Sequence, residues 1–299
     1  MGWRMTRPAF LWLTVVACAL GTASAAASGF GLNAPMAVVT TLLAVLAHAY
    51  GNVINDAHDA RNGADAANQQ GVFPFTGGSR LIQNGSVTER QTFKLAKALL
   101  VVLIPTGLLL SSQTGPGVLL LGIVGVVLAW AYSAPPLQLM SRGLGELAVA
   151  LAWFLVVIGA DYVQRPQFFL MPASAAASFA LMVAALLVIN GVPDAASDAC
   201  VGKRTLVVRI GTRPTVWVYG ALVLLAHVWL ATSIWLLIPP ASALWGELSL
   251  PFSLAAWAIL WRQAEHPQRL KPALALTVIA TLLHGIGMAW GFALVAQAR

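Results

Sequence analysis

Five of the ten acidic residues in this 299-residue chain lie in two short clusters, each at the end of a long apolar run. The clusters contain Asp56, Asp59, Asp65, Asp194 and Asp198. Carboxylates crowded in this way repel one another, so each cluster needs a compensating cation. Mg²⁺ suits them, because it binds one or two carboxylates together with waters and phosphate oxygens. The clusters therefore predict that Asp56, Asp59, Asp194 and Asp198 bind Mg²⁺ and hold a diphosphate group.

The first cluster lies on one face of a predicted helix. Asn52, Asp56 and Asp59 stand at positions i, i+4 and i+7, so their side chains share a face. Gly63 then allows the chain to leave the helix, and Asp65 is expected to fold back toward the same point. The alternative is a solvated acidic loop at the membrane surface. Cytoplasmic loops of membrane proteins favour Lys and Arg, which argues against that alternative.

The residue types in the clusters suit Mg²⁺ better than zinc. Thiolates and imidazoles at zinc spacings are absent from the sequence. His58 is the one nitrogen candidate, and a lone loop histidine is more often solvated, or a hydrogen-bond donor to a ligand, than a ligand itself. Cys18 lies inside an apolar run and Cys200 in a loop, so the two cysteines provide no disulfide framework.

The second cluster repeats the spacing of the first. Asn190, Asp194 and Asp198 stand at i, i+4 and i+8 of another predicted helix, which Pro193 is expected to kink. Both halves of the chain thus carry an Asn followed four residues later by an Asp and then by another Asp. We expect a single domain built from two related four-helix modules that face each other across a cavity. The domain covers residues 1–299, the modules about 1–134 and 145–263, and a last helix 273–296.

Two basic segments are candidates for binding the diphosphate. Gly202-Lys203-Arg204-Thr205 is not a Walker A loop, because that motif needs Gly where Ser197 stands and Ser or Thr where Arg204 stands. We expect Lys203 instead to neutralise diphosphate oxygens beside the metal. Arg80 follows a glycine-containing loop and could cover an anion together with backbone N–H groups. The alternative for the segment of Lys203 is an ordinary positively charged cytoplasmic loop. The alternative for the segment of Arg80 is a plain connecting loop.

Composition places these clusters on membrane helices. The chain is 59% hydrophobic and only 9% charged, its mean hydropathy is +0.80, and its apolar runs approach the length of a membrane-spanning helix. A membrane β-barrel is excluded, because runs such as 99–110 and 175–189 do not alternate between apolar and polar residues. We predict an all-α polytopic bundle around a central cavity. Nine spans are expected, at about 9–28, 34–54, 97–112, 117–134, 145–163, 170–192, 215–238, 249–263 and 273–296.

The basic residues orient the bundle. With the N-terminus in the cytoplasm, all of the 17 basic residues except Arg165 and Arg299 lie on the cytoplasmic side, as the positive-inside rule expects. The formal net charge of +7 then reflects membrane topology and an anion site. Nucleic-acid binding is not expected, because the basic residues are scattered among short loops. For the first span there is an alternative, since Arg4, Arg7 and Ala23-Ser24-Ala25 could belong to a cleaved signal peptide.

The motifs of this chain resemble those of the UbiA superfamily of intramembrane prenyltransferases. The resemblance rests on Asn-Asp-x-x-Asp-x5-Asp at 55–65 and on Asp-x3-Asp at 194–198, which leads into Gly-Lys-Arg-Thr-Leu-Val-Val-Arg-Ile-Gly at 202–211. Tyr-Ser-Ala-Pro-Pro-Leu at 132–137, leading to Arg-Gly-Leu-Gly-Glu at 142–146, adds to it. Within the superfamily, these segments are most similar to the 1,4-dihydroxy-2-naphthoate prenyltransferases of menaquinone biosynthesis.

The resemblance implies a fold, a location and a reaction. The fold is a nine-helix bundle whose cavity opens sideways to membrane lipid and is capped on the cytoplasmic side by the motif loops. The expected location is the bacterial inner membrane, with the N-terminus and the active-site loops in the cytoplasm. The reaction is transfer of a polyprenyl group from polyprenyl diphosphate to an aromatic acceptor. His58 and Pro193 depart from the family's pattern, and they leave the identity of the acceptor open.

The resemblance also implies roles for single residues. Mg²⁺ and Lys203 stabilise the charge on the leaving diphosphate, which eases formation of an allylic carbocation that the aromatic ring attacks. Water must be excluded, because it would hydrolyse this cation. Tyr132 and Arg142 are expected to orient the acceptor, while Glu146 either accepts its proton or favours the start of a helix near Leu144. The other expected substrate-binding residues are Asn52, Asn55, Asp65, Arg80 and Asn190.

Two other functions are compatible with the sequence. One is prenyl transfer to a different acceptor, such as 4-hydroxybenzoate, homogentisate, a tetrapyrrole or glyceryl phosphate. The other is ion or metal transport by aspartates from two repeats. Transporter sites tend to lie near the bilayer midplane on broken helices, whereas these acids lie at the ends of the predicted spans. Their position therefore favours the enzyme.

Overall fold

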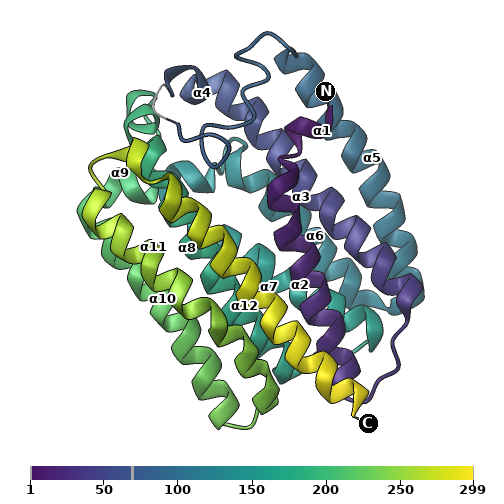
Figure 1. Ribbon diagram of the computed structural model, residues 1–299. Helices are drawn as coiled ribbons and strands as arrows, with labels where there is room; N and C mark the ends of the chain where they lie inside the picture. Colours follow the sequence, from purple (N-terminus) through teal and green to yellow (C-terminus); the bar gives the residue numbers. More distant parts are fainter. Residues whose placement is uncertain (1, 69–70, 299) are drawn as a thin grey trace.

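The computed structural model describes residues 2–68 and 71–298 as an assembly of helices, and it places no strand in those ranges (Figure 1). Nine helices of this part of the chain are long and apolar enough to cross a membrane. They are α2 (Pro8–Ala27), α3 (Ala34–Asn62), α5 (Glu89–Thr114), α6 (Pro116–Ser133), α7 (Gly145–Gln164), α8 (Leu170–Cys200), α10 (Thr212–Trp235), the continuous pair of η2 (Ala241–Ser249) and α11 (Leu250–Gln263), and α12 (Lys271–Gln297). The chain is an integral membrane protein, and the prediction of an all-α bundle with nine spans is confirmed.

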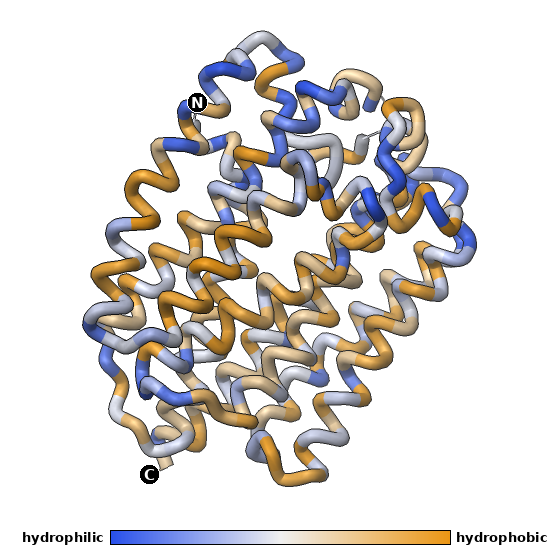
Figure 2. Tube along the Cα trace, turned by 180° about the vertical axis from the view of Figure 1, so that it is seen from behind, coloured by the Kyte–Doolittle hydropathy of each residue, from blue (hydrophilic) through white to orange (hydrophobic). Residues whose placement is uncertain are grey.

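Short helices connect the spans and gather polar residues at one end. They are α1 (Gly2–Met5), α4 (Ala64–Ala67), η1 (Leu139–Arg142), α9 (Leu206–Ile210) and η3 (Pro267–Arg269). Three of them, α1, α4 and α9, lie at the same end of the bundle in Figure 1. Figure 2 shows hydrophilic residues concentrated at this end, while the helices below it are mostly hydrophobic. We call this end the polar end.

Two spans begin earlier than hydropathy predicts. The sequence predicts the third span at 97–112, but α5 begins at Glu89, directly after a capping box that starts at Thr88. It predicts the eighth span at 249–263, but a 3-10 helix from Ala241 precedes α11. In both cases polar residues in the first turns lower the local hydropathy without interrupting the helix.

The two helices that carry the acidic clusters extend beyond their predicted spans. The sequence predicts spans at 34–54 and 170–192, whereas α3 continues to Asn62 and α8 to Cys200. Helix α8 continues through Pro193. The additional turns put both sets of aspartates on helices at the polar end.

The centre of the bundle is α8. It contacts α2, α7, α10 and α12, and it is the most buried of the spans. In contrast, α5 and α6 lie at the edge and expose large apolar side chains such as Val101, Leu109, Leu120 and Ile123. In a bilayer these side chains contact lipid, which explains their exposure.

Glycine allows close helix contact between α12 and η2. A β-carbon built at Gly291 would lie 2.1 Å from the carbonyl oxygen of Ser242, and one built at Gly287 would lie 2.3 Å from that of Trp245. Small residues four positions apart are typical of close packing between membrane helices. Larger side chains at these positions would force the two elements apart.

Gly291→Val is expected to lower the free energy of unfolding by about 1–3 kcal/mol, because overpacking displaces the neighbouring backbone. Thermal unfolding of the purified protein in detergent measures this as a lower Tm. Gly122→Val in α6 is the control, since a β-carbon at Gly122 meets nothing within 4 Å. Equal Tm values for the two variants would contradict the importance of the close contact.

Candidate active site at the polar end

The first acidic cluster is folded into a buried turn. Gly63 ends α3 with φ of 85°, a left-handed conformation that glycine adopts readily. Asp65 follows on α4 and is only 6% exposed. Burial raises the pKa of Asp65 to about 7, and the carboxylates of Asp59 and Asp56 add to the increase. The cluster therefore brings three carboxyl groups together in a buried place, as its spacing predicts, and Asp65 takes up a proton more readily than a solvated aspartate.

Arg7 compensates the charge of Asp56. Its Nη2 forms an ion pair with Asp56 Oδ1 and lies 3.2 Å from Asn55 Oδ1. The other carboxylate oxygen of Asp56 accepts a hydrogen bond of 3.2 Å from the backbone N–H of Ser79. Burial alone would lower the pKa of Arg7, but Asp56 and the neighbouring carboxylates raise it, so the guanidinium stays charged. From the sequence, Arg7 was assigned to membrane topology or to a signal peptide, and this contact was not predicted.

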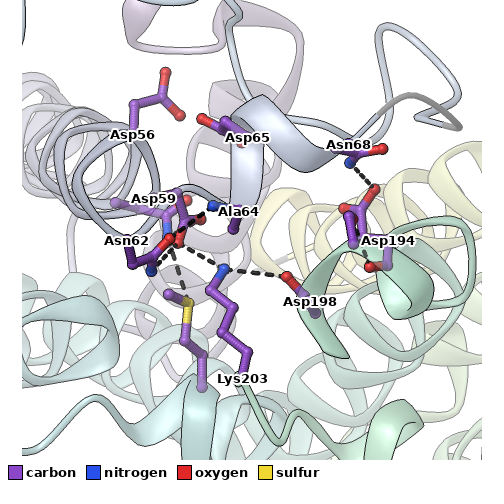
Figure 3. A network of polar contacts seen from close by, with 12 residues as sticks. Asp56, Asp59, Asn62, Ala64, Asp65, Asn68, Asp194, Asp198 and Lys203 are labelled. Carbon is purple, nitrogen blue, oxygen red and sulfur yellow. Dashed lines mark hydrogen bonds and ion pairs between the residues drawn. The ribbon is translucent and has the colours of Figure 1, made fainter. Parts of the chain in front are cut away.

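Lys203 joins the two acidic clusters, as Figure 3 shows. Its Nζ lies 2.6 Å from Asp59 Oδ1 on α3 and 3.2 Å from Asp198 Oδ1 on α8. Asp59 also accepts a hydrogen bond of 3.1 Å from the side-chain amide of Asn55. Burial acts to lower the pKa of Lys203, but the two carboxylates outweigh it and raise the pKa above its ordinary value. The two clusters, far apart in the sequence, thus meet around one buried ammonium group.

The loop that follows α4 reaches the second cluster. Asn68 Nδ2 donates a hydrogen bond of 2.7 Å to Asp194 Oδ1 (Figure 3). The backbone N–H of Gly77 lies 3.4 Å from the other carboxylate oxygen of Asp194. Neither contact has a local sequence signal, because each joins segments more than a hundred residues apart. They hold Asn68 and Gly77 at the end of α8.

These side chains line a polar cavity of about 130 Å³. Its acidic wall residues are Asp59, Asp65, Glu146, Asp194 and Asp198, and its basic wall residues are Arg7 and Lys203. Five acids against two bases leave a surplus of three acidic side chains. Asp56 is not on this wall, and its carboxylate contacts Arg7 and Ser79.

A mostly apolar chamber of about 220 Å³ adjoins the polar cavity. The residues that line both are Arg7, Asn55, Phe75, Tyr132, Leu187 and Asn190. The predicted site residues Tyr132 and Asn190 therefore lie at the junction of the two spaces. Asn52 lies on the chamber wall, and its amide donates a hydrogen bond of 2.9 Å to the carbonyl oxygen of Thr6. The two spaces together suit a molecule with a charged head and a long apolar body.

Two predicted substrate-binding residues, Arg80 and Arg142, lie on neither wall. Arg80 Nη1 donates hydrogen bonds to the carbonyl oxygens of Asp65 at 3.1 Å and Asn68 at 2.8 Å, so it holds its loop against α4. Arg142 is exposed and donates a hydrogen bond of 2.8 Å to the carbonyl oxygen of Pro136. These are contacts of loop-stabilising side chains, and the binding roles of both residues stay predictions.

The donor chemistry of the polar cavity fits Mg²⁺. Asp59, Asp194 and Asp198 offer carboxylate oxygens, the donors that this ion prefers. Within residues 2–68 and 71–298, no three His, Cys, Asp or Glu side chains converge closely enough to hold an ion by themselves. Mg²⁺ needs only one or two carboxylates when waters and phosphate oxygens complete its shell. Asp59 and Asp198 form such a pair, since both lie within 3.2 Å of the same Lys203 nitrogen.

A membrane bundle that places a charged cavity beside an apolar chamber is suited to a lipid substrate with an ionic head. The fold and the site thus define an integral membrane protein with cavities that suit an amphiphilic ligand. Comparison with known proteins identifies the family: the profile of the UbiA prenyltransferase family matches residues 10–279. The chain belongs to this family, and it is a prenyltransferase.

Relatives and solved structures agree with this membership. The 1,4-dihydroxy-2-naphthoate octaprenyltransferase of Escherichia coli (strain K12) is 31% identical over 294 residues, which are 93% of this chain and 90% of the relative. The protein of the same name from Mycobacterium tuberculosis is 27% identical over 241 residues, 80% of each chain. A solved UbiA homolog from Archaeoglobus fulgidus bound to DMAPP and Mg²⁺ matches with a TM-score of 0.67 at 19% identity, covering 100% of this chain and 99% of that chain. The nine-helix bundle implied by the motifs is confirmed, and the membership favours prenyl transfer over ion transport.

Proposed function

We propose that this prenyltransferase carries out the Mg²⁺-dependent transfer of a polyprenyl group from polyprenyl diphosphate to an aromatic acceptor. One observation carries the proposal: the polar cavity has a surplus of three acidic side chains and shares wall residues with the apolar chamber. A diphosphate is an anion, so this acidic wall repels it unless a divalent cation binds with it. The hydrocarbon tail of the same molecule matches the chamber.

The aspartates are the proposed metal ligands. Asp59, Asp194 and Asp198 line the polar cavity and would hold the cation. Asp56 joins them when its ion pair with Arg7 opens. A Mg²⁺ ion bound there would act as a Lewis acid and offset the negative charge developing on the leaving diphosphate.

Arg7 and Lys203 are the protein's own cations at the diphosphate. Both line the polar cavity, and Lys203 is 7% exposed. In a site that excludes bulk water, ion pairs between such groups and phosphate oxygens are stronger than at a solvated surface. Lys203 turns from Asp59 and Asp198 toward the diphosphate when the substrate binds.

Transfer begins when the allylic carbon–oxygen bond of the prenyl diphosphate breaks. The diphosphate leaves with the electron pair, and a ring carbon of the acceptor attacks the allylic cation. Tyr132 lies at the junction of the polar cavity and the chamber. The allylic carbon joins the diphosphate head to the hydrocarbon tail, so it is expected to lie at this junction. Glu146 on the polar wall accepts the proton that the ring loses; if Glu146 only favours the start of α7, the departing diphosphate takes up this proton. The apolar chamber excludes water, which would otherwise consume the cation.

We further propose 1,4-dihydroxy-2-naphthoate as the acceptor, which places the reaction in menaquinone biosynthesis. The names of the relatives from Escherichia coli and Mycobacterium tuberculosis support this choice. The expected location is a bacterial inner membrane, with the N-terminus and the polar end in the cytoplasm. The distribution of Lys and Arg along the sequence supports this orientation.

Product analysis by mass spectrometry tests the proposal. Purified protein in lipid vesicles is given farnesyl diphosphate, Mg²⁺ and a mixture of the competing acceptors 4-hydroxybenzoate, homogentisate, glyceryl phosphate, a tetrapyrrole and 1,4-dihydroxy-2-naphthoate. We expect diphosphate release and a farnesylated naphthalene ring, with the carboxylate retained or lost as CO2, and both are abolished by a chelator and restored by Mg²⁺. A product on another acceptor would correct the substrate alone. Turnover that persists in the chelator would contradict the role of the metal.

A further inference from the structure

Thr14, His48 and Trp153 form a polar patch on the wall of the apolar chamber. His48 Nδ1 lies 2.8 Å from Thr14 Oγ1. The imidazole packs edge-on against Trp153, with the ring centroids 4.8 Å apart. The three residues come from α2, α3 and α7, so the patch is a product of tertiary packing. The reaction described above gives it no role.

The hydrogen bond to Thr14 uses only one ring nitrogen of His48. If Thr14 donates, Nε2 carries the proton and is a donor; if Thr14 accepts, Nε2 is an acceptor. In either case, Nε2 has no partner within residues 2–68 and 71–298. Buried His284 differs, because its Nε2 lies 2.7 Å from Ser178 and its Nδ1 lies 3.1 Å from Ser249. His284 is a satisfied packing residue, whereas His48 leaves a polar atom unused at the chamber wall.

Other polar atoms on the same wall also lack partners. Arg7 Nε, Trp153 Nε1 and Asn190 Oδ1 are buried without a hydrogen bond in the described part of the chain. Buried polar groups are paired in the great majority of cases. An isoprenoid tail cannot pair them, because a hydrocarbon offers neither donor nor acceptor. The chamber therefore suits a ligand that brings oxygen atoms of its own in addition to the tail.

The position of His48 on α3 relates it to the reacting groups. His48, Asn52 and Asn55 stand at i, i+4 and i+7, so their side chains follow one face of the helix toward the acidic cluster. At 1.5 Å per residue, His48 lies about 10 Å along the axis from Asn55, which lines both cavities. This separation leaves room for an aromatic ring between His48 and the junction.

We propose that His48 binds the aromatic acceptor. Its Nε2 forms a hydrogen bond to an oxygen substituent of the acceptor, either a ring hydroxyl or a carboxylate, and this bond turns the reacting carbon toward the junction. Thr14 is a positioning residue that holds the imidazole, and Trp153 supports the ring from its other side. The assignment rests on the proposed transfer to an aromatic acceptor, and it adds the residue that orients that acceptor.

Kinetics with two acceptors test the assignment. Farnesyl diphosphate is combined with 1,4-dihydroxy-2-naphthoate or with 1,4-dihydroxynaphthalene, which lacks the carboxylate. His48→Phe keeps an aromatic ring and is expected to raise the acceptor KM about tenfold, the effect of one lost hydrogen bond, without changing the KM for farnesyl diphosphate. His48→Gln retains a donor and an acceptor and is expected to restore part of the affinity. An effect on both acceptors assigns the bond to a hydroxyl, and an effect on the naphthoate alone assigns it to the carboxylate.

Two further sets of variants serve as controls. His58→Gln is the matched control on α3, because His58 packs against Phe93, with ring centroids 5.4 Å apart, and lines neither cavity. It is expected to behave as wild type. Thr14→Val tests the same hydrogen bond if His48→Phe does not fold. It is expected to raise the acceptor KM about threefold. Thr14→Ser keeps the hydroxyl and is expected to have an acceptor KM near that of the wild type.

The outcomes separate this assignment from the proposed function. An unchanged acceptor KM in folded His48→Phe and Thr14→Val proteins overturns the role of His48. So does a rise in the KM for farnesyl diphosphate without a rise in the acceptor KM, which would assign His48 to the prenyl tail. In both cases the proposed reaction stands. Transfer by the wild-type protein to neither acceptor would overturn the proposed acceptor and the role of His48 together.

Discussion

Asp194→Asn is expected to reduce the turnover of prenyl transfer by about a hundred- to a thousandfold. Asp194 lines the polar cavity on α8, so the substitution removes the charge of a proposed metal ligand. It preserves the shape of the side chain, and Asn still offers an oxygen to the hydrogen bond from Asn68. The variant is therefore expected to insert and fold normally. Initial rates at saturating Mg²⁺, normalised to folded protein, measure the loss.

Asp56→Asn is the companion variant. We expect a comparable loss of turnover, together with a lower Tm, because buried Arg7 loses the charge of its ion-pair partner. Glu265→Gln is the control, since it removes an acidic charge from an exposed ion pair with Arg213 and should leave turnover unchanged. Near-wild-type rates in both aspartate variants at saturating Mg²⁺ would remove metal-assisted ionisation from the proposed mechanism.

The spans and the two acidic clusters could be predicted because their signals are local. The length of an apolar run predicts a membrane helix, and the spacing of Asn190, Asp194 and Asp198 predicts a shared helix face. The positions of the clusters at span ends also follow from the run lengths. The structure adds that the clusters meet, through the contacts of Lys203 with Asp59 and Asp198. The division of the chain into two related modules stays a prediction.

Contacts between distant segments could not be predicted. In the sequence, Arg7 is a basic residue beside a membrane span, like many others. Its ion pair with Asp56 arises because the start of α2 lies beside the end of α3 in the folded bundle. Asn68 meets Asp194 for the same kind of reason, since α4 packs against α8. Tertiary packing decides these pairs, and no local pattern encodes it.

The roles of basic residues near the motifs could not be predicted from the neighbouring sequence either. Arg80, Arg142 and Lys203 all occur in polar loops beside recognisable motifs. In the structure, Lys203 lines the polar cavity, while Arg80 and Arg142 hydrogen-bond to backbone carbonyl oxygens of their own surroundings. A guanidinium can bind phosphate or stabilise a loop with the same donors. Only the fold determines which acceptors lie within its reach.

Lys203→Met is expected to raise the KM for polyprenyl diphosphate by about ten- to a hundredfold, the effect of losing a charge-assisted hydrogen bond in a buried site. Methionine keeps most of the length of the side chain and removes only the charge. Lys94→Met is the matched control, because Lys94 is exposed on α5 and lines neither cavity. Steady-state kinetics at saturating acceptor and Mg²⁺ measure both variants.

The same variant is expected to bind Mg²⁺ alone more tightly than the wild-type protein. Lys203 lies 2.6 Å from Asp59 and 3.2 Å from Asp198, so it competes with a cation for these carboxylates. Without Lys203, the two carboxylates repel each other until a cation binds. The rise in Tm with Mg²⁺ concentration reports this affinity. Unchanged values for both the diphosphate KM and the Mg²⁺ affinity would leave Lys203 with its alternative role, a positive charge that sets membrane topology.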